Sequence, residues 1–549
     1  CNFSGSNGTL IVGMDEAGLW TDGRYFVQAE KQLSGTEYKL MRMGSAGVPA
    51  LNEYCRELLK EGMTIGFDGR CVQAGQGIEF KKMAEFNKAH CNYSFDAIEQ
   101  IYNDRAEFPH SKAFYLDTMY SGKTIKDKLI DVRCAMKDNM SDVHIIASLD
   151  DICWLFNIRG RDVHCNPVIM AYAAVYMDKT VLYTDIDRLD DCIDKLIEAG
   201  VEVKPYNDIY EDIKKLDADT TLLLDKVRLN YALYKNIPEQ VTIVDVQNPE
   251  ILFKALKNET EIENIRKAQI KDSIAHVRFM KWVKENVNKQ EITEISASDK
   301  LDEFRAEMGN FLRPSFDPIS AYGEHGAIVH YSSTPETNIQ VKEGSLLLMD
   351  TGAGFYEGST DVTRTYALGE IPQYMKDDFT LVAISNLCLA DARFKEGISG
   401  ANLDYLARRP FWERNMDFNH GTGHGVGYLL NVHEGPAGFH WRTRGNSICP
   451  FQKGMVITDE PGIYIEGSHG IRLENEVLVC EGEKNEYGQF LHFEIITLIP
   501  FDLDAINPDI MTESEKKLLN QYHAKVYETL APHLTEEEAE WLKKYTREI

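Results

Sequence analysis

Two segments in the second half of the chain share one design, in which an apolar strand and its returning partner each carry an acidic residue. In SLLLMDTGAGFYEGSTDVTRTYAL, an apolar run ends at Asp350, a glycine-rich turn follows, and a threonine-rich strand carries Asp361. In GMVITDEPGIYIEGSHGIRLENEVLV, the apolar run ends at Glu460 and the returning strand carries Glu474. Each segment is a candidate β-hairpin, and both pairs of acids are predicted to face the same place.

These four carboxylates constrain what surrounds them. A single acid at the end of a strand is most simply a turn or cap residue. Four carboxylates on apolar strands need cations close by, because burying an unpaired charge is costly. The two segments contain no lysine, and their arginines are Arg364 and Arg472. Two divalent metal ions would neutralise all four negative charges.

Three histidines cluster within fourteen positions between the two acidic segments, in a chain with only fifteen: His420, His424 and His433 in NHGTGHGVGYLLNVHEGP. His420 and His424 have the spacing of the helical H-E-x-x-H zinc motif, but glycines alternate through the stretch and disfavour a helix. A glycine-lined strand or loop lets the backbone approach a ligand and leaves one imidazole to join the carboxylates. Isolated histidines are more often structural than ligands, so this interpretation depends on the glycines and the four acids.

The chain is too long, at 549 residues, for one hydrophobic core. We predict three parts, with limits 1–108, 109–253 and 254–549, and a proline-containing linker, EFPHSK, after the first. Strands alternate with helices in the first two parts, which predicts an α/β fold class. GLWTDGRY in the first part and VLYTDIDR in the second share an apolar strand, an aromatic residue and Thr-Asp. Chance or a duplicated domain explains this echo.

Helical patterns frame the third part. Apolar residues recur with a period near 3.6 over residues 257–287, which predicts a long helix facing the core, without chemistry of its own. A second helix is predicted near 294–308. The helices predicted over 512–549 show no chemistry, and we expect them to pack structurally or at a dimer contact.

Composition limits the partners and the compartment. The longest nearly uninterrupted apolar run, VIMAYAAVYM, is shorter than the roughly 20 residues that span a bilayer, so we expect a soluble protein. A formal net charge of −28 disfavours nucleic acid and membrane partners. Eleven scattered cysteines without a C-x-x-C pair predict reduced thiols and a cytoplasmic location. The chain begins at Cys1, so a targeting segment could precede it.

Taken together, GTGHGVG, NVHEGP, TDEPG and IRLENEV around the acids and histidines resemble the pita-bread metallopeptidases of family M24B. Within that family the chain is most similar to the three-domain cytosolic aminopeptidases P, or Xaa-Pro aminopeptidases. WTDGRYF, WLFNIRG and TEISASDK extend the resemblance over nearly the whole chain. The resemblance implies two similar N-terminal α/β domains of the creatinase and prolidase type, the first without its start, followed by a C-terminal pita-bread catalytic domain.

The resemblance also implies a metal site with two divalent ions, held by Asp350, Asp361, His424, Glu460 and Glu474. Asp361 and Glu474 would bridge the ions, Asp350 would complete one, and His424 with Glu460 would complete the other. Oxygen-rich ligation with one imidazole suits Mn²⁺, although Co²⁺ or Zn²⁺ can occupy such a site. A hydroxide bridging the ions would be the nucleophile, and Glu460 would act as general base.

The resemblance also implies roles for the remaining side chains of the site. His330, His420 and His433 would line the pocket and bond the scissile peptide, and His330 would stabilise charge on the carbonyl oxygen. Without the resemblance, His330 alone is more simply a strand histidine with a structural hydrogen bond. Arg472 would orient a metal-binding carboxylate. Arg24 in WTDGRY would reach the peptide from the first domain or from a partner subunit, unless it caps a turn.

The implied activity is hydrolysis of the bond between a free N-terminal residue and a following proline, by an enzyme expected to form homodimers. Proline lacks the amide N–H and has a fixed φ, so peptidases that recognise an extended backbone handle it poorly. Two alternatives remain: a prolidase restricted to Xaa-Pro dipeptides, and a peptide-binding module that kept the fold without catalysis. Chain-length preference separates the first, and metal content separates the second.

Overall fold

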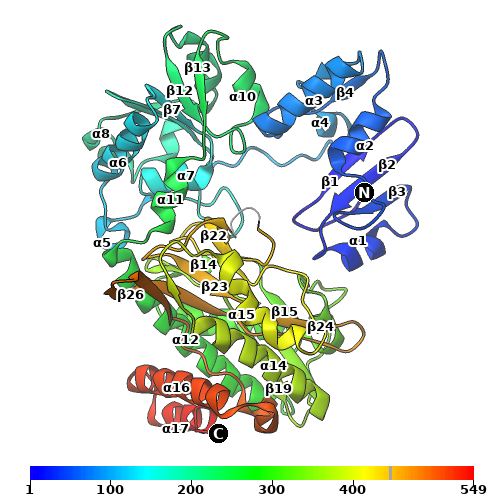
Figure 1. Ribbon diagram of the computed structural model, residues 1–549, viewed down its shortest axis with the longest axis vertical. Helices are drawn as coiled ribbons and strands as arrows, with labels where there is room; N and C mark the ends of the chain where they lie inside the picture. The colour runs from blue at the N-terminus through cyan, green and yellow to red at the C-terminus, as the bar shows by residue number, and fades with distance from the viewer. Residues whose placement is uncertain (444–447) are drawn as a thin grey trace. The chain divides into compact units, whose positions relative to one another are not determined.

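A computed structural model describes residues 1–443 and 448–549 and divides the chain into two compact units, Cys1–Ile251 and Leu252–Ile549 (Figure 1). Each unit is described by itself. The three parts predicted from the sequence, with their limits near residues 108 and 253, stay predictions.

The first unit mixes short strands with short helices. Its strands are β1 (Thr9–Val12), β2 (Ala17–Thr21), β3 (Tyr38–Arg42), β4 (Thr64–Gly66), β5 (His90–Asn92), β6 (Phe114–Tyr115), β7 (Val143–Ile146), β8 (Ile158–Arg159), β9 (Tyr172–Tyr176), β10 (Thr180–Tyr183), β11 (Val201–Lys204), β12 (Thr221–Leu224) and β13 (Thr242–Asp245). Its helices are α1 (Phe26–Leu33), α2 (Leu51–Leu58), α3 (Ala74–Phe86), α4 (Ala97–Ile101), α5 (Thr118–Ser121), α6 (Ile125–Asp138), α7 (Leu149–Leu155), α8 (Ile193–Glu198), α9 (Ile209–Asp212) and α10 (Tyr231–Lys235), followed by α11 (Pro249–Ala255).

The two main sheets of this unit repeat one pairing pattern. β1 pairs antiparallel with β2, and β2 pairs parallel with β3 after the crossover helix α1. In the six-stranded sheet, of order β11-β10-β9-β7-β12-β13, β9 pairs antiparallel with β10, and β10 pairs parallel with β11 after α8. The echoing segments GLWTDGRY and VLYTDIDR begin on the middle strands, β2 and β10, of these two arrangements. The predicted echo therefore corresponds to a repeated strand–helix–strand arrangement.

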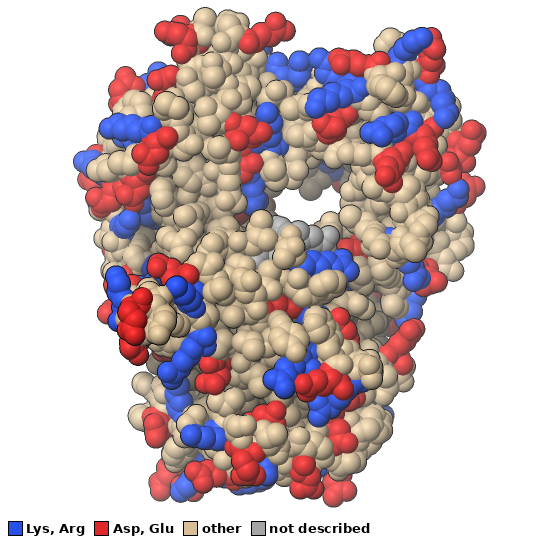
Figure 2. All heavy atoms as spheres, viewed as in Figure 1, with Lys and Arg blue, Asp and Glu red and all other residues tan. Residues whose placement is uncertain are grey.

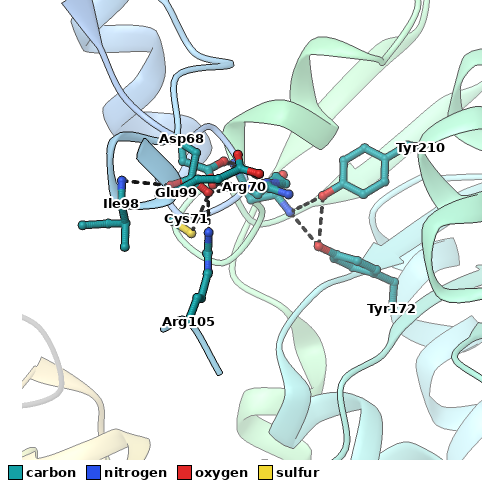
Figure 3. A network of polar contacts seen from close by, with 10 residues as sticks. Asp68, Arg70, Cys71, Ile98, Glu99, Arg105, Tyr172 and Tyr210 are labelled. Atoms are coloured by element: carbon teal, nitrogen blue, oxygen red, sulfur yellow. Dashed lines mark hydrogen bonds and ion pairs between the residues drawn. The ribbon is translucent and has the colours of Figure 1, made fainter. Parts of the chain in front are cut away.

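The stretch between the two sheets has the irregular structure predicted for a linker. Residues 102–113, all of them described, lie outside helices and strands. Arg105 donates a hydrogen bond of 2.6 Å to Asp96, the N-cap residue of α4, and Figure 3 shows Arg105 pointing toward the neighbouring Arg70. At its other end, Ser111 donates to Asp162 at 2.7 Å through its hydroxyl. Side-chain hydrogen bonds thus fix both ends of the linker.

The second unit is built around long helices and antiparallel sheets. Its helices are α12 (Glu259–Asn286), α13 (Glu294–Glu307), α14 (Gln373–Ala390), α15 (Gly400–Trp412), α16 (Glu513–Leu530) and α17 (Glu536–Tyr545). Its strands are β14 (Phe311–Pro314), β15 (Ile319–Tyr322), β16 (Ser345–Thr351), β17 (Ala353–Phe355), β18 (Gly358–Ser359), β19 (Val362–Leu368), β20 (Arg393–Lys395), β21 (Gly423–Gly425), β22 (Glu434–Phe439), β23 (Val456–Asp459), β24 (Gly462–Ile465), β25 (His469–Arg472), β26 (Asn475–Asn485) and β27 (Gly488–Ile495).

Helices α12 and α13 confirm the predicted helical pattern. Asn258 caps α12 by accepting a hydrogen bond from the backbone N–H of Glu261, whose side chain accepts one from the Asn258 N–H in return. Such a capping box satisfies backbone donors that the first turn leaves without intrahelical partners. The predicted apolar stripe faces the core, with Ile274 and Val277 at most 3% exposed. Thr293 and Ser296 form the corresponding start of α13.

Both predicted hairpins exist as antiparallel ladders, and each encloses a smaller hairpin. β16 pairs with β19 in the sheet β15-β16-β19, and the short strands β17 and β18 lie between them in sequence. β23 pairs with β26 in the sheet β20-β27-β26-β23-β21-β22, and β24 pairs with β25 within the connection. The simple turns expected from the sequence are therefore longer excursions, each with a strand pair of its own.

The C-terminal helices pack against this unit. α16 and α17, drawn in red in Figure 1, contact α12, and α16 also contacts α14. Leu519, Val526, Leu530 and Leu542 are completely buried in the same hydrophobic cluster as Phe379 of α14. These residues close the side of the core that α12 and α14 leave open.

No helix in residues 1–443 and 448–549 is long and apolar enough to cross a membrane. On the face drawn in Figure 2, basic and acidic side chains are interspersed over both units. Exposed ion pairs include Lys195 with Glu198 and Arg409 with Glu413. Ion pairs of this kind contribute little to stability.

We predict that Phe279→Ala lowers the free energy of unfolding of the second unit by about 3–5 kcal/mol, because it leaves a cavity in a close-packed core. Phe279 of α12 is completely buried, with the rings of Trp282 and Tyr366 at centroid distances of 5.9 and 5.7 Å. Urea denaturation followed by circular dichroism measures the change. Tyr487→Ala is the control, because the Tyr487 side chain is 69% exposed. Equal effects of the two substitutions would contradict this account of the core.

Candidate metal centre

The four acids predicted from the sequence lie where the two strand ladders end. Asp350 is the next-to-last residue of β16 and lies opposite Thr363 of β19, and Asp361 immediately precedes β19. Glu460 directly follows β23, and Glu474 directly precedes β26. The backbone N–H of Glu474 donates to the carbonyl oxygen of Thr363 at 3.1 Å. This bond joins the two ladders and brings their acidic ends to one place.

His424 completes the cluster. It lies on the short strand β21 rather than on a helix, as its glycine neighbours predicted. Ligand atoms of Asp361, His424 and Glu474 lie within 4.8 Å of one another. The Nε2 atom of His424 is 3.5 Å from an oxygen of Asp361 and 3.7 Å from an oxygen of Glu460. Its Nδ1 lies 3.0 Å from the carbonyl oxygen of Gly425, which makes Nδ1 the protonated nitrogen and directs the Nε2 lone pair at the carboxylates.

The electrostatics of the cluster favour a cation. Burial raises the pKa of Asp361 and of Glu474 well above the usual range, and the charges of neighbouring carboxylates, Asp350 and Glu460 among them, raise it further. Burial lowers the pKa of His424 to about 4, so its imidazole is neutral at pH 7. Among the described residues, Oδ1 of Asp350 is buried without a hydrogen-bond partner. Carboxylate oxygens with one neutral imidazole form a donor set that fits divalent cations.

Arg472 is the basic residue inside this cluster. It is 2% exposed, and its Nη2 donates to Oδ2 of Asp350 at 2.5 Å. Its Nε donates to the hydroxyl of Thr363 at 3.2 Å, and that hydroxyl donates to Glu474 at 2.9 Å. One guanidinium thus orients two carboxylates, one directly and one through a threonine.

His420 lies beside Arg472 and is linked to it by Tyr464. The Tyr464 hydroxyl accepts a hydrogen bond of 2.8 Å from Nη1 of Arg472 and lies 2.8 Å from Nε2 of His420. Nδ1 of His420 lies 2.7 Å from the carbonyl oxygen of Gly421. Burial, together with the positive charge of Arg472, lowers the pKa of His420 to about 3. His420 is therefore a neutral imidazole whose Nε2 accepts from Tyr464.

The other residues predicted for the site are His433, His330 and Arg24. The His433 ring lies 4.3 Å from the ring of His424, centroid to centroid. His330 lies in a turn rather than in a strand, and its charge lowers the pKa of both His420 and His424. His420, His424, His433 and His330 therefore lie around the carboxylates. Arg24 lies in the first unit, where it forms a 2.8 Å ion pair with Asp22.

Three residues of the site were not predicted from the sequence: Thr363, Tyr464 and Glu476. Glu476 is completely buried and accepts a hydrogen bond of 2.7 Å from the backbone N–H of Asp361. Thr363 and Glu476 each lie two residues beyond a predicted acid, so the two-residue period of a strand could have found them. Tyr464 lies on the inserted strand β24, and no spacing relates it to the acids.

Four segments of the chain match known protein families. Residues 263–481 match metallopeptidase family M24, and residues 489–549 match the C-terminal region of peptidase M24. Residues 1–99 and residues 104–261 each match a creatinase/prolidase N-terminal domain. The predicted fold class is confirmed: two α/β domains of this type precede a pita-bread domain.

Similar proteins cover the chain from end to end. Xaa-Pro aminopeptidase 1 of Dictyostelium discoideum is 33% identical over 565 residues, covering 100% of this chain and 90% of the relative. The crystal structure of X-prolyl aminopeptidase from Caenorhabditis elegans, a cytosolic enzyme with a di-nuclear active site, superposes with a TM-score of 0.94 at 33% identity and covers 100% of this chain and 91% of that one. Xaa-Pro dipeptidase from Bacillus anthracis shares the fold at 23% identity, with a TM-score of 0.56 over 69% of this chain and 99% of its own. The chain therefore belongs to metallopeptidase family M24 and, within it, to the aminopeptidase P group of Xaa-Pro aminopeptidases.

Proposed function

We propose that the chain removes the N-terminal residue from peptides with proline at the second position, using two divalent metal ions. Asp350, Asp361, His424, Glu460 and Glu474 would hold the ions. The observation that carries the proposal is the charge of the cluster: four carboxylates converge where Arg472 provides one positive charge. The di-nuclear active site of the related nematode enzyme supports the same number of ions.

The donor set decides the kind of ion and its chemistry. Oxygen-rich ligation with one imidazole favours Mn²⁺, with Co²⁺ and Zn²⁺ as alternatives. When bound, such ions would supply a nucleophilic water at neutral pH and polarise the scissile carbonyl. Asp361 and Glu474, the most deeply buried of the carboxylates, are the proposed bridging ligands.

Glu460 is the proposed general base. Its side chain is 20% exposed, so it can reach both the ions and an incoming peptide. It would take a proton from the attacking water and pass it to the proline nitrogen as that nitrogen leaves. The Nε2 lone pair of His424 would be used to bind an ion, which leaves Glu460 as the proton acceptor of the two.

The histidines around the cluster would hold the peptide. His330 and His433 are proposed to bond the scissile peptide and its carbonyl oxygen. Both ring nitrogens of His420 are already engaged, with Gly421 and Tyr464, so contact with a peptide requires the Tyr464 hydroxyl to exchange its partner.

The location and assembly stay proposals. All eleven cysteines are free thiols, which supports a reducing cytoplasm, as does the cytosolic location of the nematode relative. The predicted homodimer, and the predicted contact of Arg24 with a peptide, also remain proposals.

We predict that metal-stripped protein cleaves neither Arg-Pro-Pro nor Arg-Pro, and that added Mn²⁺ restores release of arginine from the tripeptide, with the dipeptide cleaved more slowly. Amino-acid analysis of the products measures this. Asp361→Asn, which removes a proposed bridging carboxylate, is expected to abolish the response to Mn²⁺. Activity on the dipeptide alone would mean a prolidase, and metal binding without cleavage would mean a binding module.

We predict that Mn²⁺ raises the melting temperature more at pH 7.5 than at pH 5.5. The pKa of Asp361 and of Glu474 is raised in the folded protein, so these two carboxyl groups hold more protons in the folded state than in the unfolded state above about pH 4. Stability contributed by these protons is lost as pH rises toward the raised pKa values. The ions displace those protons, so binding should release them. Scanning calorimetry with and without Mn²⁺ at both pH values tests this, and an equal shift at both would contradict it.

We predict that Tyr464→Phe lowers kcat/KM for Arg-Pro-Pro by about 10- to 100-fold, the usual effect of removing a partner that orients metal ligands. The substitution removes the hydroxyl that joins Arg472 to His420. Tyr374→Phe is the control, because Tyr374 is 53% exposed and lies beside His469 instead. Steady-state kinetics at saturating Mn²⁺ compares the variants. Identical kinetics for Tyr464→Phe and wild type would remove Tyr464 from the site.

A further inference from the structure

A buried polar network lies behind the ladder that carries Asp350 and Asp361. Its members come from both long helices and from the two strands of the ladder, and none is more than 1% exposed. They are Asp272 and His276 of α12, Arg305 of α13, Thr351 of β16, Tyr366 of β19, and Thr360, which lies two residues before β19. The sequence predicted only a core-facing surface for these helices.

An ion pair is the centre of the network. Nε of Arg305 donates to Oδ1 of Asp272 at 2.7 Å, and Nη2 donates to Oδ2 at 3.3 Å. Burial alone would raise the pKa of Asp272, but the opposing effects, led by the charge of Arg305 and including hydrogen bonds from Arg305 and Thr360, together outweigh burial, so the pKa is lowered. His276 accepts from Nη2 of Arg305 at 3.3 Å, and burial lowers its pKa to about 3, so it adds no charge. The pair is therefore ionised and stays so at neutral pH.

Each member of the ion pair bonds a threonine next to a proposed metal ligand. Nη2 of Arg305 donates to the hydroxyl of Thr351 at 3.0 Å, and Thr351 follows Asp350. The hydroxyl of Thr360 donates to Oδ2 of Asp272 at 2.6 Å, and Thr360 precedes Asp361. The pair thus holds the chain at the residues next to Asp350 and Asp361.

Asp361 needs such a restraint because the ladder ends before it. The last pair of the β16–β19 ladder is Thr351 with Val362, so Thr360 and Asp361 lie outside it. Outside the ladder, the backbone of Thr360 is held by two hydrogen bonds: its N–H donates to the carbonyl oxygen of Ala353 at 2.8 Å, and its carbonyl oxygen accepts from the Ser315 hydroxyl at 2.8 Å. Its side chain is held through the hydroxyl, which also accepts from the N–H of Ala353 at 2.9 Å. A buried ion pair adds little net stability compared with apolar side chains of the same volume, so its value here lies in position.

We propose that Asp272 and Arg305 are positioning residues that set the separation of Asp350 and Asp361 through Thr351 and Thr360. The proposal rests on the proposed metal function of those two acids. Under this proposal both residues act through the threonines and not by contact with the ions or the peptide. Because Asp272 belongs to α12 and Arg305 to α13, the packing of these two helices would fix the distance between Asp350 and Asp361.

Thr360→Val and Thr351→Val test the proposal, because each removes one hydroxyl link and keeps the shape of the side chain. Mn²⁺ binding by titration calorimetry and kcat and KM for Arg-Pro-Pro at saturating Mn²⁺ are the measurements. Each variant is expected to weaken binding of at least one Mn²⁺ by about 10- to 100-fold and to lower kcat, with a smaller change in KM. Thr360→Ser, which keeps the hydroxyl, is expected to restore both.

Thr380→Val is the matched control. Thr380 of α14 is completely buried, its hydroxyl donates to the carbonyl oxygen of Lys376 at 2.7 Å, and it accepts from the N–H of Asn507 at 2.8 Å. This variant loses as many hydrogen bonds as Thr360→Val, so it is expected to lower the melting temperature and leave Mn²⁺ affinity unchanged.

Two outcomes separate this inference from the proposed function. If wild type binds Mn²⁺ and the two valine variants bind it equally well, while melting like Thr380→Val, the network is structural and the inference is wrong. If wild type itself binds no Mn²⁺, the metal function fails first. Should Thr360→Val not fold, Thr351→Val decides alone: weaker Mn²⁺ binding supports the inference, and unchanged binding overturns it.

Discussion

The mutual repulsion of buried carboxylates is the constraint on which the second unit depends. These carboxylates would separate if the chain allowed it, because the charges of Asp350 and Glu460 raise the cost of ionising Asp361 and Glu474. What keeps them together is backbone geometry. Two antiparallel ladders, β16 with β19 and β23 with β26, end at the same place and are joined by the bond between Glu474 N–H and the Thr363 carbonyl. Hydrogen bonding and core packing thus hold an arrangement that electrostatics alone opposes, and binding of cations converts that opposition into affinity.

Distant parts of the chain converge on the same few positions. Arg364 of β19 is completely buried and donates to the carbonyl oxygen of Glu474 at 2.5 Å and to the side chain of Asn475 at 2.7 Å. It also donates to the hydroxyl of Tyr522 at 2.9 Å, and Tyr522 belongs to α16. The C-terminal helices, for which the sequence offered no chemistry, therefore support the strand that carries a proposed bridging ligand. Burying an arginine requires several acceptors, and here those acceptors are the backbone around the ligand.

Patterns that are local in sequence predicted the structure best. The long helix expected over 257–287 exists as Glu259–Asn286, because its apolar stripe and its capping box are both written within a few residues. The ladders were predicted from strand pattern, whereas the enclosed strands β17, β18, β24 and β25 were not, since two to four residues carry too little pattern. Of the site, the acids and His424 stood out as charges in an apolar or glycine-rich setting. Tyr464 and Arg305 did not, because their contacts join residues far apart in sequence and only the folded chain brings them together.

The charges of the site also indicate why one arginine is placed among its acids. The four carboxylates of Asp350, Asp361, Glu460 and Glu474 lie around the positive charge of Arg472, while His420 and His424 are neutral at pH 7 because burial lowers their pKa values to about 3 and about 4. Under the proposed occupancy, two divalent ions bring as many positive charges as the carboxylates bring negative ones. The charge of Arg472 is in addition to these, and its Nη1 donates to the hydroxyl of Tyr464, which in turn bonds Nε2 of His420. A positive charge fixed beside the ions would help to stabilise the negative charge that develops on a scissile carbonyl oxygen, because fixed dipoles and charges stabilise such an oxygen best when they are in place beforehand. A lysine at position 472 could carry the charge, but it has no planar fork with which to hold Asp350, Thr363 and Tyr464 together.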